Sequence, residues 1–185
     1  MRLSRVFGCI ALLALTSLSV VAQQGLKSGP QVGAEVPGPY HPLNVTGPFA
    51  GKKQCLFCKH GPNPVAVVFA RELTPEVTDL LKKLDAATAK NKDAKMGSYA
   101  VFCNDDEKLQ GNLKSLAEKE KLSNLPLTVD NASGPADYSI AKDADVTVIL
   151  YREFNVKSNF AFRKGELKEG EITKIVADVS KIVTK

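Results

Sequence analysis

The chain has 185 residues, of which 44% are hydrophobic and 24% are charged. These proportions are ordinary for a globular protein, and the length allows one domain to bury a core without metal or disulfide staples. The formal net charge of +5 is mild, and the sequence has no basic run and no alternation of basic with aromatic residues. We therefore expect no nucleic-acid partner.

The N-terminus is typical of a secretory signal. Arg2 and Arg5 precede an apolar stretch, residues 6–18, that is too short to span a bilayer comfortably. Small residues follow, and cleavage is predicted between Ala22 and Gln23, so that residues 1–22 form a signal peptide. An uncleaved anchor helix is the alternative. Cleavage predicts an exported protein, periplasmic or extracellular, without a stable membrane span.

The cysteine count agrees with the predicted export. Cleavage would remove Cys9 and leave Cys55, Cys58 and Cys103 in an oxidising compartment. The simplest arrangement is one disulfide, Cys55–Cys58, and one thiol. Cys103 ends a predicted buried strand, so it is interpreted as a small core hydrophobe, with a resolving or resting-thiol role as the alternative.

The first part of the mature chain is predicted to be extended. Residues 23–48 are rich in Gly and Pro and form a linker and lead-in, which belongs to the fold from about residue 32. The domain proper is predicted from residue 49 to residue 185. Residues 51–64 are predicted to be a loop or tight hairpin, because Gly and Pro punctuate them. Residues 65–70 are a continuous apolar run, as in a strand buried on both faces.

A helix is predicted next, with Thr74 as N-cap, Pro75 at the first helical position and Glu76 near the positive end of the dipole. Its apolar stripe consists of Val77, Leu80, Leu81 and Leu84. Residues 98–103 are a second predicted strand. Residues 104–106 (Asn-Asp-Asp) then cap a second helix.

The C-terminal part adds a short extended piece at residues 125–129, a strong strand at 146–151, and an alternating strand at 159–163. A last amphipathic helix begins at Glu171. Right-handed crossovers make the first two strands parallel, and the short link makes the last two antiparallel. The sequence thus predicts an α/β fold with a mixed central sheet and helices on both faces.

The compact cluster of reactive side chains is a Cys-x-x-Cys followed by a histidine. Cys55 and Cys58 at this spacing can form a redox-active dithiol or a structural disulfide that pins a loop. Positive charge from Lys53, Lys59 and His60 would favour the thiolate of a redox pair.

A transition-metal site is the third interpretation of this cluster. Cys55, Cys58, His60 and His41 would make a set of ligands suited to Zn or Cu. Covalent haem attachment is not predicted, because it requires Cys-x-x-Cys-His and Lys59 follows Cys58 here. We otherwise expect no cofactor.

The element order, with several local matches, resembles the thioredoxin-like superfamily, and within it the redoxin or peroxiredoxin-like branch (the alkyl hydroperoxide reductase and thiol-specific antioxidant type). The resemblance covers about residues 32–183. The matching segments are residues 32–37 (Val-Gly-Ala-Glu-Val-Pro), 104–106, 116–119 (Leu-Ala-Glu-Lys), 125–127 (Leu-Pro-Leu), 138–140 (Tyr-Ser-Ile) and 163–166 (Arg-Lys-Gly-Glu).

The departures from the family pattern concern its catalytic positions. In peroxiredoxins a cysteine follows the Thr-Pro-x pattern, whereas here the next residue is Val77. Thioredoxins carry their Cys-x-x-Cys between first strand and first helix, but that turn has no cysteine here. Its Arg71 and Glu72 are predicted to be surface charges. The cis-proline before the third strand is also absent, because residues 143–146 (Asp-Ala-Asp-Val) occupy that region.

The resemblance implies an antioxidant or oxidoreductase activity by thiol–disulfide exchange, with protein thiols or disulfides as partners. By analogy with the N-terminal cysteine of other Cys-x-x-Cys pairs, Cys55 would attack the partner, and Cys58 would resolve the mixed disulfide. A conventional peroxidase is not expected, because Val77 is no nucleophile. The competing hypothesis is a non-catalytic interaction module that keeps the fold and uses the disulfide as a staple.

Overall fold

The computed structural model describes residues 25–184. The predicted signal peptide (residues 1–22), its cleavage between Ala22 and Gln23, and Cys9 lie outside the described residues. Within the described range, no helix has both the length and the apolar character needed to cross a membrane.

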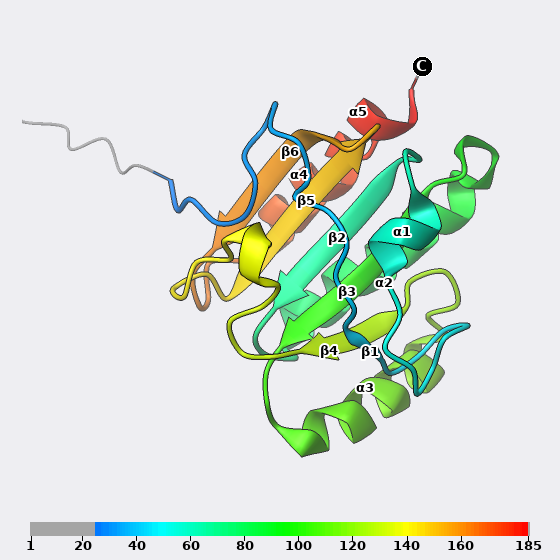
Figure 1. Cartoon of the computed structure of the whole chain (residues 1–185), viewed down its shortest axis with the longest axis vertical. Helices are drawn as coiled ribbons and strands as arrows, with labels where there is room; N and C mark the ends of the chain where they lie inside the picture. The colour runs from blue at the N-terminus through cyan, green and yellow to red at the C-terminus, as the bar shows by residue number, and fades with distance from the viewer. Residues whose placement is uncertain (1–24, 185) are drawn as a thin grey trace, which may run out of the picture.

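The centre of the fold is a mixed six-stranded sheet with the order β1-β4-β3-β2-β5-β6 (Figure 1). Strands β2, β3 and β4 run parallel to one another, whereas β1, β5 and β6 are antiparallel to their neighbours. The strands are β1 (Leu43–Asn44), β2 (Val65–Ala70), β3 (Gly97–Cys103), β4 (Leu127–Asp130), β5 (Val146–Arg152) and β6 (Asn155–Phe162).

Two of the longer helices begin where their capping residues predict. The hydroxyl of Thr74 accepts a hydrogen bond from the N–H of Val77, and Asp106 accepts one from the N–H of Lys108. The α-helices are α1 (Leu56–His60), α2 (Pro75–Lys90), α3 (Glu107–Glu120), α4 (Glu169–Asp178) and α5 (Ser180–Val183), and the 3₁₀ turns are η1 (Lys92–Ala94) and η2 (Ala136–Tyr138).

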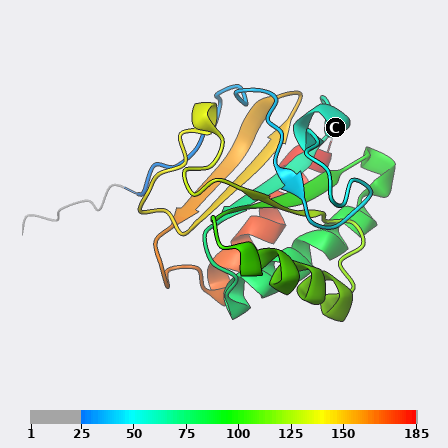
Figure 2. The same cartoon turned by 60° about the horizontal axis from the view of Figure 1, so that its bottom comes forward.

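The sheet separates two apolar layers. Helices α2 to α5 pack on one side, here called the helical face, where Leu80, Leu113 and Ile175 contribute to one core cluster. The other side, here called the lead-in face, is covered by the N-terminal segment, α1 and η2 (Figure 2). Leu56 of α1 and Tyr138 of η2 belong to this second cluster. Helices therefore lie on both faces, as predicted, although the lead-in face carries only short ones.

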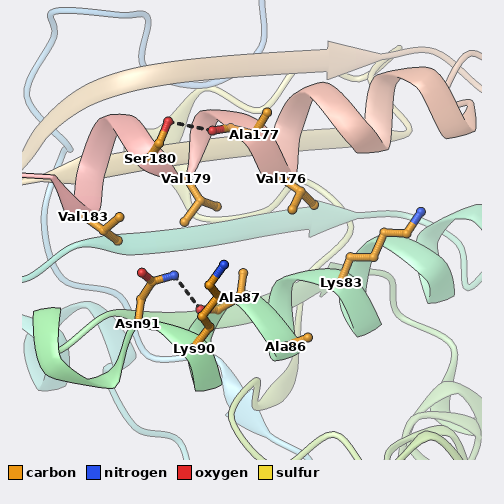
Figure 3. A pocket seen from close by; sticks show the side chains of 10 residues that line it. All are labelled: Lys83, Ala86, Ala87, Lys90, Asn91, Val176, Ala177, Val179, Ser180 and Val183. Carbon is orange, nitrogen blue, oxygen red and sulfur yellow. Dashed lines mark hydrogen bonds between the residues drawn. The ribbon is translucent and has the colours of Figure 1, made fainter.

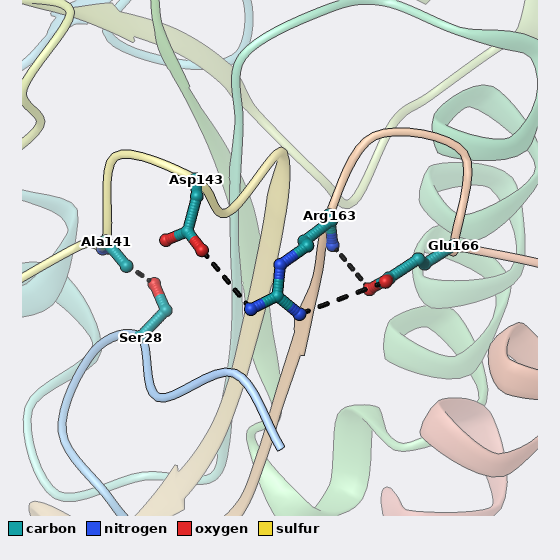
Figure 4. Close-up of polar contacts among 5 residues, drawn as sticks. All are labelled: Ser28, Ala141, Asp143, Arg163 and Glu166. Carbon is teal, nitrogen blue, oxygen red and sulfur yellow. Dashed lines mark hydrogen bonds and ion pairs between the residues drawn. The ribbon is translucent and has the colours of Figure 1, made fainter. Parts of the chain in front are cut away.

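The beginning of the lead-in is hydrogen-bonded to β5. The hydroxyl groups of Ser28 and Thr147 are hydrogen-bonded at 2.6 Å, and the N–H of Ala141 donates to Ser28 Oγ at 3.0 Å (Figure 4). Nearby, the Arg163 guanidinium lies 3.3 Å from a carboxylate oxygen of Asp143. The segment thus joins the fold a few residues earlier than residue 32, because Ser28 is buried against the sheet.

The predicted strand pairs are confirmed, with β2 parallel to β3 and β5 antiparallel to β6. The short extended piece after α3 is the full sheet strand β4, and β6 starts at Asn155 rather than at residue 159. The prediction of a loop or hairpin for residues 51–64 is wrong in one respect, because this segment contains the helix α1.

Candidate functional site

The Cys-x-x-Cys spans the beginning of α1. Cys55 is the N-cap of this helix, and its Sγ accepts a hydrogen bond from the N–H of Cys58 at 3.0 Å. The two cysteines form a disulfide. The motif thus has the helix N-terminus that the sequence did not predict, although α1 is only five residues long.

The two sulfur-bearing residues differ sharply in exposure. Cys55 is 2% exposed, whereas Cys58 is exposed to solvent. The reason is that Leu56, next to Cys55, is buried in the lead-in face and holds the start of the helix down. Any partner therefore reaches the disulfide from the side of Cys58.

The other end of α1 is seated by His60. The imidazole stacks on the ring of Tyr99, with centroids 6.1 Å apart and planes 4° from parallel, and it lies over Gly97 at the start of β3. Burial, together with the smaller effect of the neighbouring Lys59 charge, lowers the pKa of His60 to about 4. His60 is therefore neutral at pH 7, and the expectation that it adds positive charge beside the thiols is wrong.

We expect Gly97→Ala to destabilise the fold by about 1–3 kcal/mol, because an added Cβ would collide with the His60 imidazole and force α1 to move. The measurement is urea unfolding. Gly111→Ala is the matched control, since a Cβ there meets nothing within 4 Å, and it should stabilise helix α3 by about 1 kcal/mol. Unfolding of the Gly97→Ala variant at the wild-type midpoint would contradict the seating of α1 by His60.

The segment leading into the disulfide is held by one buried side chain. The Nδ2 of Asn44 lies within 3.2 Å of the carbonyl oxygens of Pro42, Lys52 and Gln54. Gln54 immediately precedes Cys55, so these bonds fix where the chain enters α1. Asn44 itself is 1% exposed.

The structure does not bring the hypothetical metal ligands together. Cys55 and Cys58 are joined to each other, and His60 stacks on Tyr99. His41 lines a cavity that none of the other three residues lines. Among residues 25–184, no group of three His, Cys, Asp or Glu side chains is arranged to hold a metal ion. The donor set thus does not fit a Zn or Cu site in this oxidised form.

The turn that carries the catalytic residues of the resembled families is occupied by structural groups. Val77 is 1% exposed and packs in the core of the helical face, on the opposite side of the sheet from α1. Arg71 donates three hydrogen bonds, to the carbonyl oxygens of Ala132, Ala141 and Ala144. It therefore ties the loop before β5 to the sheet, and its interpretation as a mere surface charge is wrong.

Glu72, the other residue predicted to be a surface charge in this turn, is exposed and lies 2.6 Å from Lys164 Nζ. That prediction agrees with the structure.

Cys103 lies on the lead-in face at the C-terminal end of β3, and it is 3% exposed. Burial raises the pKa of its thiol to about 12, although Arg71 opposes the shift. Position 97, over which His60 sits, is six residues away along the same strand, which corresponds to roughly 20 Å. Cys103 is thus a protonated thiol in the core, as the interpretation of a small hydrophobe predicts.

All four tyrosines of the chain lie in the apolar layer of the lead-in face, with Tyr99 on β3, Tyr151 on β5, Tyr40 in the lead-in and Tyr138 in η2. The hydroxyl of Tyr40 donates to Tyr99 Oη at 3.2 Å, and that of Tyr138 donates to the carbonyl of Gly38 at 2.9 Å. Burial raises the pKa of Tyr99 well above its usual value, so the ring under His60 is uncharged. This cluster was not predictable from the sequence, because it forms only when the lead-in and η2 pack on β3 and β5.

A cavity of about 490 Å³ lies on the helical face between α2 and α4–α5 (Figure 3). Alanine and valine side chains form its walls, and Lys83 and Lys90 lie at its rim. No cysteine or histidine lines it. It is separated from the disulfide by the whole sheet.

A scan against protein-family models finds no match for this chain, and a search of curated proteins finds none either. Solved structures do match. The chain is similar to a Bacteroides thetaiotaomicron protein assigned provisionally as a protein disulfide isomerase, with 15% identity and a TM-score of 0.63 over 86% of this chain and 96% of that one.

Two further solved structures are similar to this chain. A 2-Cys peroxiredoxin from Plasmodium vivax matches with 18% identity and a TM-score of 0.58, over 81% of this chain and 82% of the other. A protein from Chlorobium tepidum, assigned provisionally as a thiol:disulfide interchange protein, matches with 19% identity and a TM-score of 0.53, over 84% and 99%. At these identities the likeness establishes the fold and leaves the activity open. The chain therefore has the thioredoxin-like fold, in the arrangement shared by peroxiredoxins and disulfide oxidoreductases.

Proposed function

We propose that the protein exchanges thiols and disulfides with other proteins through Cys55 and Cys58. The observation that carries the proposal is a disulfide with one exposed and one buried cysteine, in which the buried Sγ already accepts a backbone hydrogen bond. The thioredoxin-like fold supports it, because proteins with similar structures are described as disulfide isomerases and interchange proteins. Export to an oxidising compartment is part of the same proposal and rests on the N-terminal sequence.

The exposure pattern favours roles that are the reverse of those implied by analogy. A partner thiolate attacks Cys58 Sγ, because Cys58 is the accessible side of the pair. A sulfur–sulfur bond forms between the partner and Cys58, the Cys55–Cys58 bond breaks, and Cys55 leaves as the thiolate. A second partner thiolate then attacks the partner's own sulfur in the mixed disulfide and releases Cys58. Two electrons pass from the partner dithiol, which becomes a disulfide, to the protein, which becomes a dithiol.

The surroundings of Cys55 suit a leaving thiolate. The N–H of Cys58 lies 3.0 Å from Cys55 Sγ, and a hydrogen bond to a charged acceptor is stronger than one to a neutral acceptor. The same thiolate remains within reach of the mixed disulfide and can reverse the step. Cys55 is then the resolving cysteine, and Cys58 is the one that bonds to the partner.

A non-catalytic interaction module is the second candidate. It is favoured by the shortness of α1, since a five-residue helix has little stability of its own and the disulfide clamps its first turn. In this case the disulfide should resist small thiols in the native protein.

The test is to expose the native oxidised protein to reduced glutathione, block free thiols by alkylation, and identify the modified cysteines by peptide mass spectrometry. We expect Cys58 to be alkylated without denaturant, and the buried Cys55 to react as a free thiol with a second reagent of different mass after alkylation and unfolding. The buried Cys103 is the internal control and should stay unmodified until the protein is unfolded. Opening of the pair only in denaturant would reject exchange and favour the staple.

A further inference from the structure

A groove of about 430 Å³ borders the disulfide helix. It is lined by Glu35, Val36, Pro37, Gly38, Phe57 and Phe154. Phe57 lies between the two cysteines in sequence and directly precedes the exposed Cys58. Its ring contacts that of Phe154, with centroids 5.5 Å apart. An apolar surface, here called the Phe groove, thus begins within one residue of the accessible sulfur.

The far wall of the Phe groove is built into the sheet. The N–H of Val36 donates to the carbonyl of Phe154 at 2.7 Å, and the N–H of Val156 donates to Ala34 at 2.9 Å. These bonds pair the lead-in with the start of β6, beside α1 and the β5–β6 turn (Figure 1). The groove is therefore formed before any partner arrives.

The β5–β6 turn carries residue types that its backbone conformation does not favour. Glu153 and Phe154, the two residues of the β5–β6 turn, both have positive φ, at 53° and 60°. Glycine and asparagine suit such a turn, and a bulky residue with positive φ is an outlier. Strain of this kind is found at functional sites. Here it places an aromatic ring against Phe57, where the ring completes the apolar wall of the groove.

Lys59 lies on the flank of α1 opposite Phe57, because its Nζ lies over the ring of Phe49 whereas Phe57 contacts Phe154. Lys52 and Lys59 are exposed near Phe49, and neither forms an ion pair within the described residues. Lys53 instead lines a separate cavity together with Asp105 and Asp106. The sequence has no Asp or Glu between Val36 and Arg71. Glu35, the one acidic residue that lines the groove, lies on its far wall. The surface beside Cys58 is therefore suited to a negatively charged partner.

We propose that the protein selects its partners by docking an aromatic or large aliphatic side chain on one side of the partner cysteine into the Phe groove, with acidic residues on the other side of this cysteine facing Lys52 and Lys59. The occupant is an extended, cysteine-bearing segment of a partner protein. This inference rests on the proposed exchange at Cys58 and adds a substrate class to it. Attack at Cys58 proceeds as described above, with Cys55 as the leaving thiolate.

The experiment uses the Cys55→Ser variant, in which Cys58 is a single thiol at the site, and short peptides whose one cysteine is joined to thionitrobenzoate. The Cys58 thiolate attacks the peptide sulfur and releases thionitrobenzoate, which is followed by its absorbance, and peptide mapping verifies the bond to Cys58. Four peptides combine Phe or Ser on one side of the cysteine with Asp or Lys on the other side. Each rate is divided by the rate of the same peptide with free cysteine, which removes differences in intrinsic reactivity.

We expect the Phe/Asp peptide to react about tenfold faster than the Ser/Lys peptide after this correction. Adding Phe154→Gly should remove the advantage of Phe over Ser, and glycine accepts the positive φ at this turn. Adding Lys59→Gln, or raising the salt concentration, should reduce the advantage of Asp over Lys. Lys114→Gln, a change at an exposed lysine of α3, is the control that should alter neither ratio.

Equal corrected rates for all four peptides would overturn the docking proposal and leave exchange at Cys58 standing, provided that a glutathione–thionitrobenzoate disulfide reacts. An advantage of Phe over Ser that persists in the Phe154→Gly variant would also overturn it. If no disulfide reacts with Cys58 in the native protein, both the exchange function and this inference fall.

Discussion

Cys58→Ser is expected to abolish the capture of partner proteins, whereas Cys55→Ser is expected to accumulate them as stable mixed disulfides. The reason is the unequal burial of the pair: Cys58 is exposed and can bond to a partner, while Cys55, at 2% exposure, can only resolve that bond. Without Cys55 the mixed disulfide has no intramolecular thiol to break it. Each variant is incubated with reduced, unfolded proteins while these proteins reoxidise. Non-reducing electrophoresis of the mixture then measures the mixed disulfides.

Cys103→Ser is the control for this comparison, because the third cysteine is buried and protonated and should not change the result. The opposite pattern, with stable complexes in the Cys58→Ser variant, would restore the roles implied by analogy and contradict the assignment made from exposure. Complexes that depend on Cys103 would contradict the whole site.

Acidification from pH 7 to pH 4 is expected to reduce the free energy of unfolding by about 3 kcal/mol through His60 alone. Burial lowers the pKa of His60 to about 4 in the folded state, whereas an unfolded histidine has a pKa of about 6.5. Between these two values the unfolded chain binds a proton that the folded chain does not, so stability falls as the pH falls. Above pH 6.5 the imidazole is neutral in both states and has no effect.

The measurement is urea unfolding at pH 7 and at pH 4. His60→Phe keeps an aromatic ring over Tyr99 but removes the titrating group, so its stability should fall less on acidification. The chain has one other histidine, His41, which is exposed, and His41→Gln should retain the full pH dependence. Equal pH dependence in the wild type and the His60→Phe variant would show that His60 is not buried in neutral form.

The sheet was predictable because its strands carry strong local signals. The run of residues 65–70 is apolar at every position, and β2 occupies the same range with all six residues buried. Thr74 and Asp106 cap their helices through side-chain oxygens, as their residue types predict. In these elements local preference and tertiary packing agree, which is when reasoning from sequence succeeds.

The site was less predictable because its features depend on contacts between distant residues. Helix α1 has five residues, too few to show an apolar period, and Gly61 and Pro62 directly after it indicate a turn. Its seating depends on Tyr99 and Gly97, which only the β2–β3 register places beneath His60. Neither the burial of Cys55 nor the neutral charge of His60 could be derived without that contact.

The turn between β2 and α2 was also only partly predictable from the sequence. Val77 could be recognised from sequence as a residue without nucleophilic chemistry, and the structure adds that it fills the core. Arg71 appeared to be a surface charge because its acceptors are three backbone carbonyls of a loop some seventy residues away. Hydrogen bonds to backbone carbonyls cannot be predicted from the types of side chains in the sequence.

The reduction potential of the Cys55–Cys58 pair, measured in the native protein by equilibration with glutathione buffers, tests the central claim most directly. Exchange with partner proteins predicts a potential between about −270 and −120 mV, the range in which thioredoxin-like oxidoreductases work. A potential below about −300 mV is typical of structural disulfides and would contradict the account. The pair would then be a staple for α1, and the protein an interaction module with the same fold.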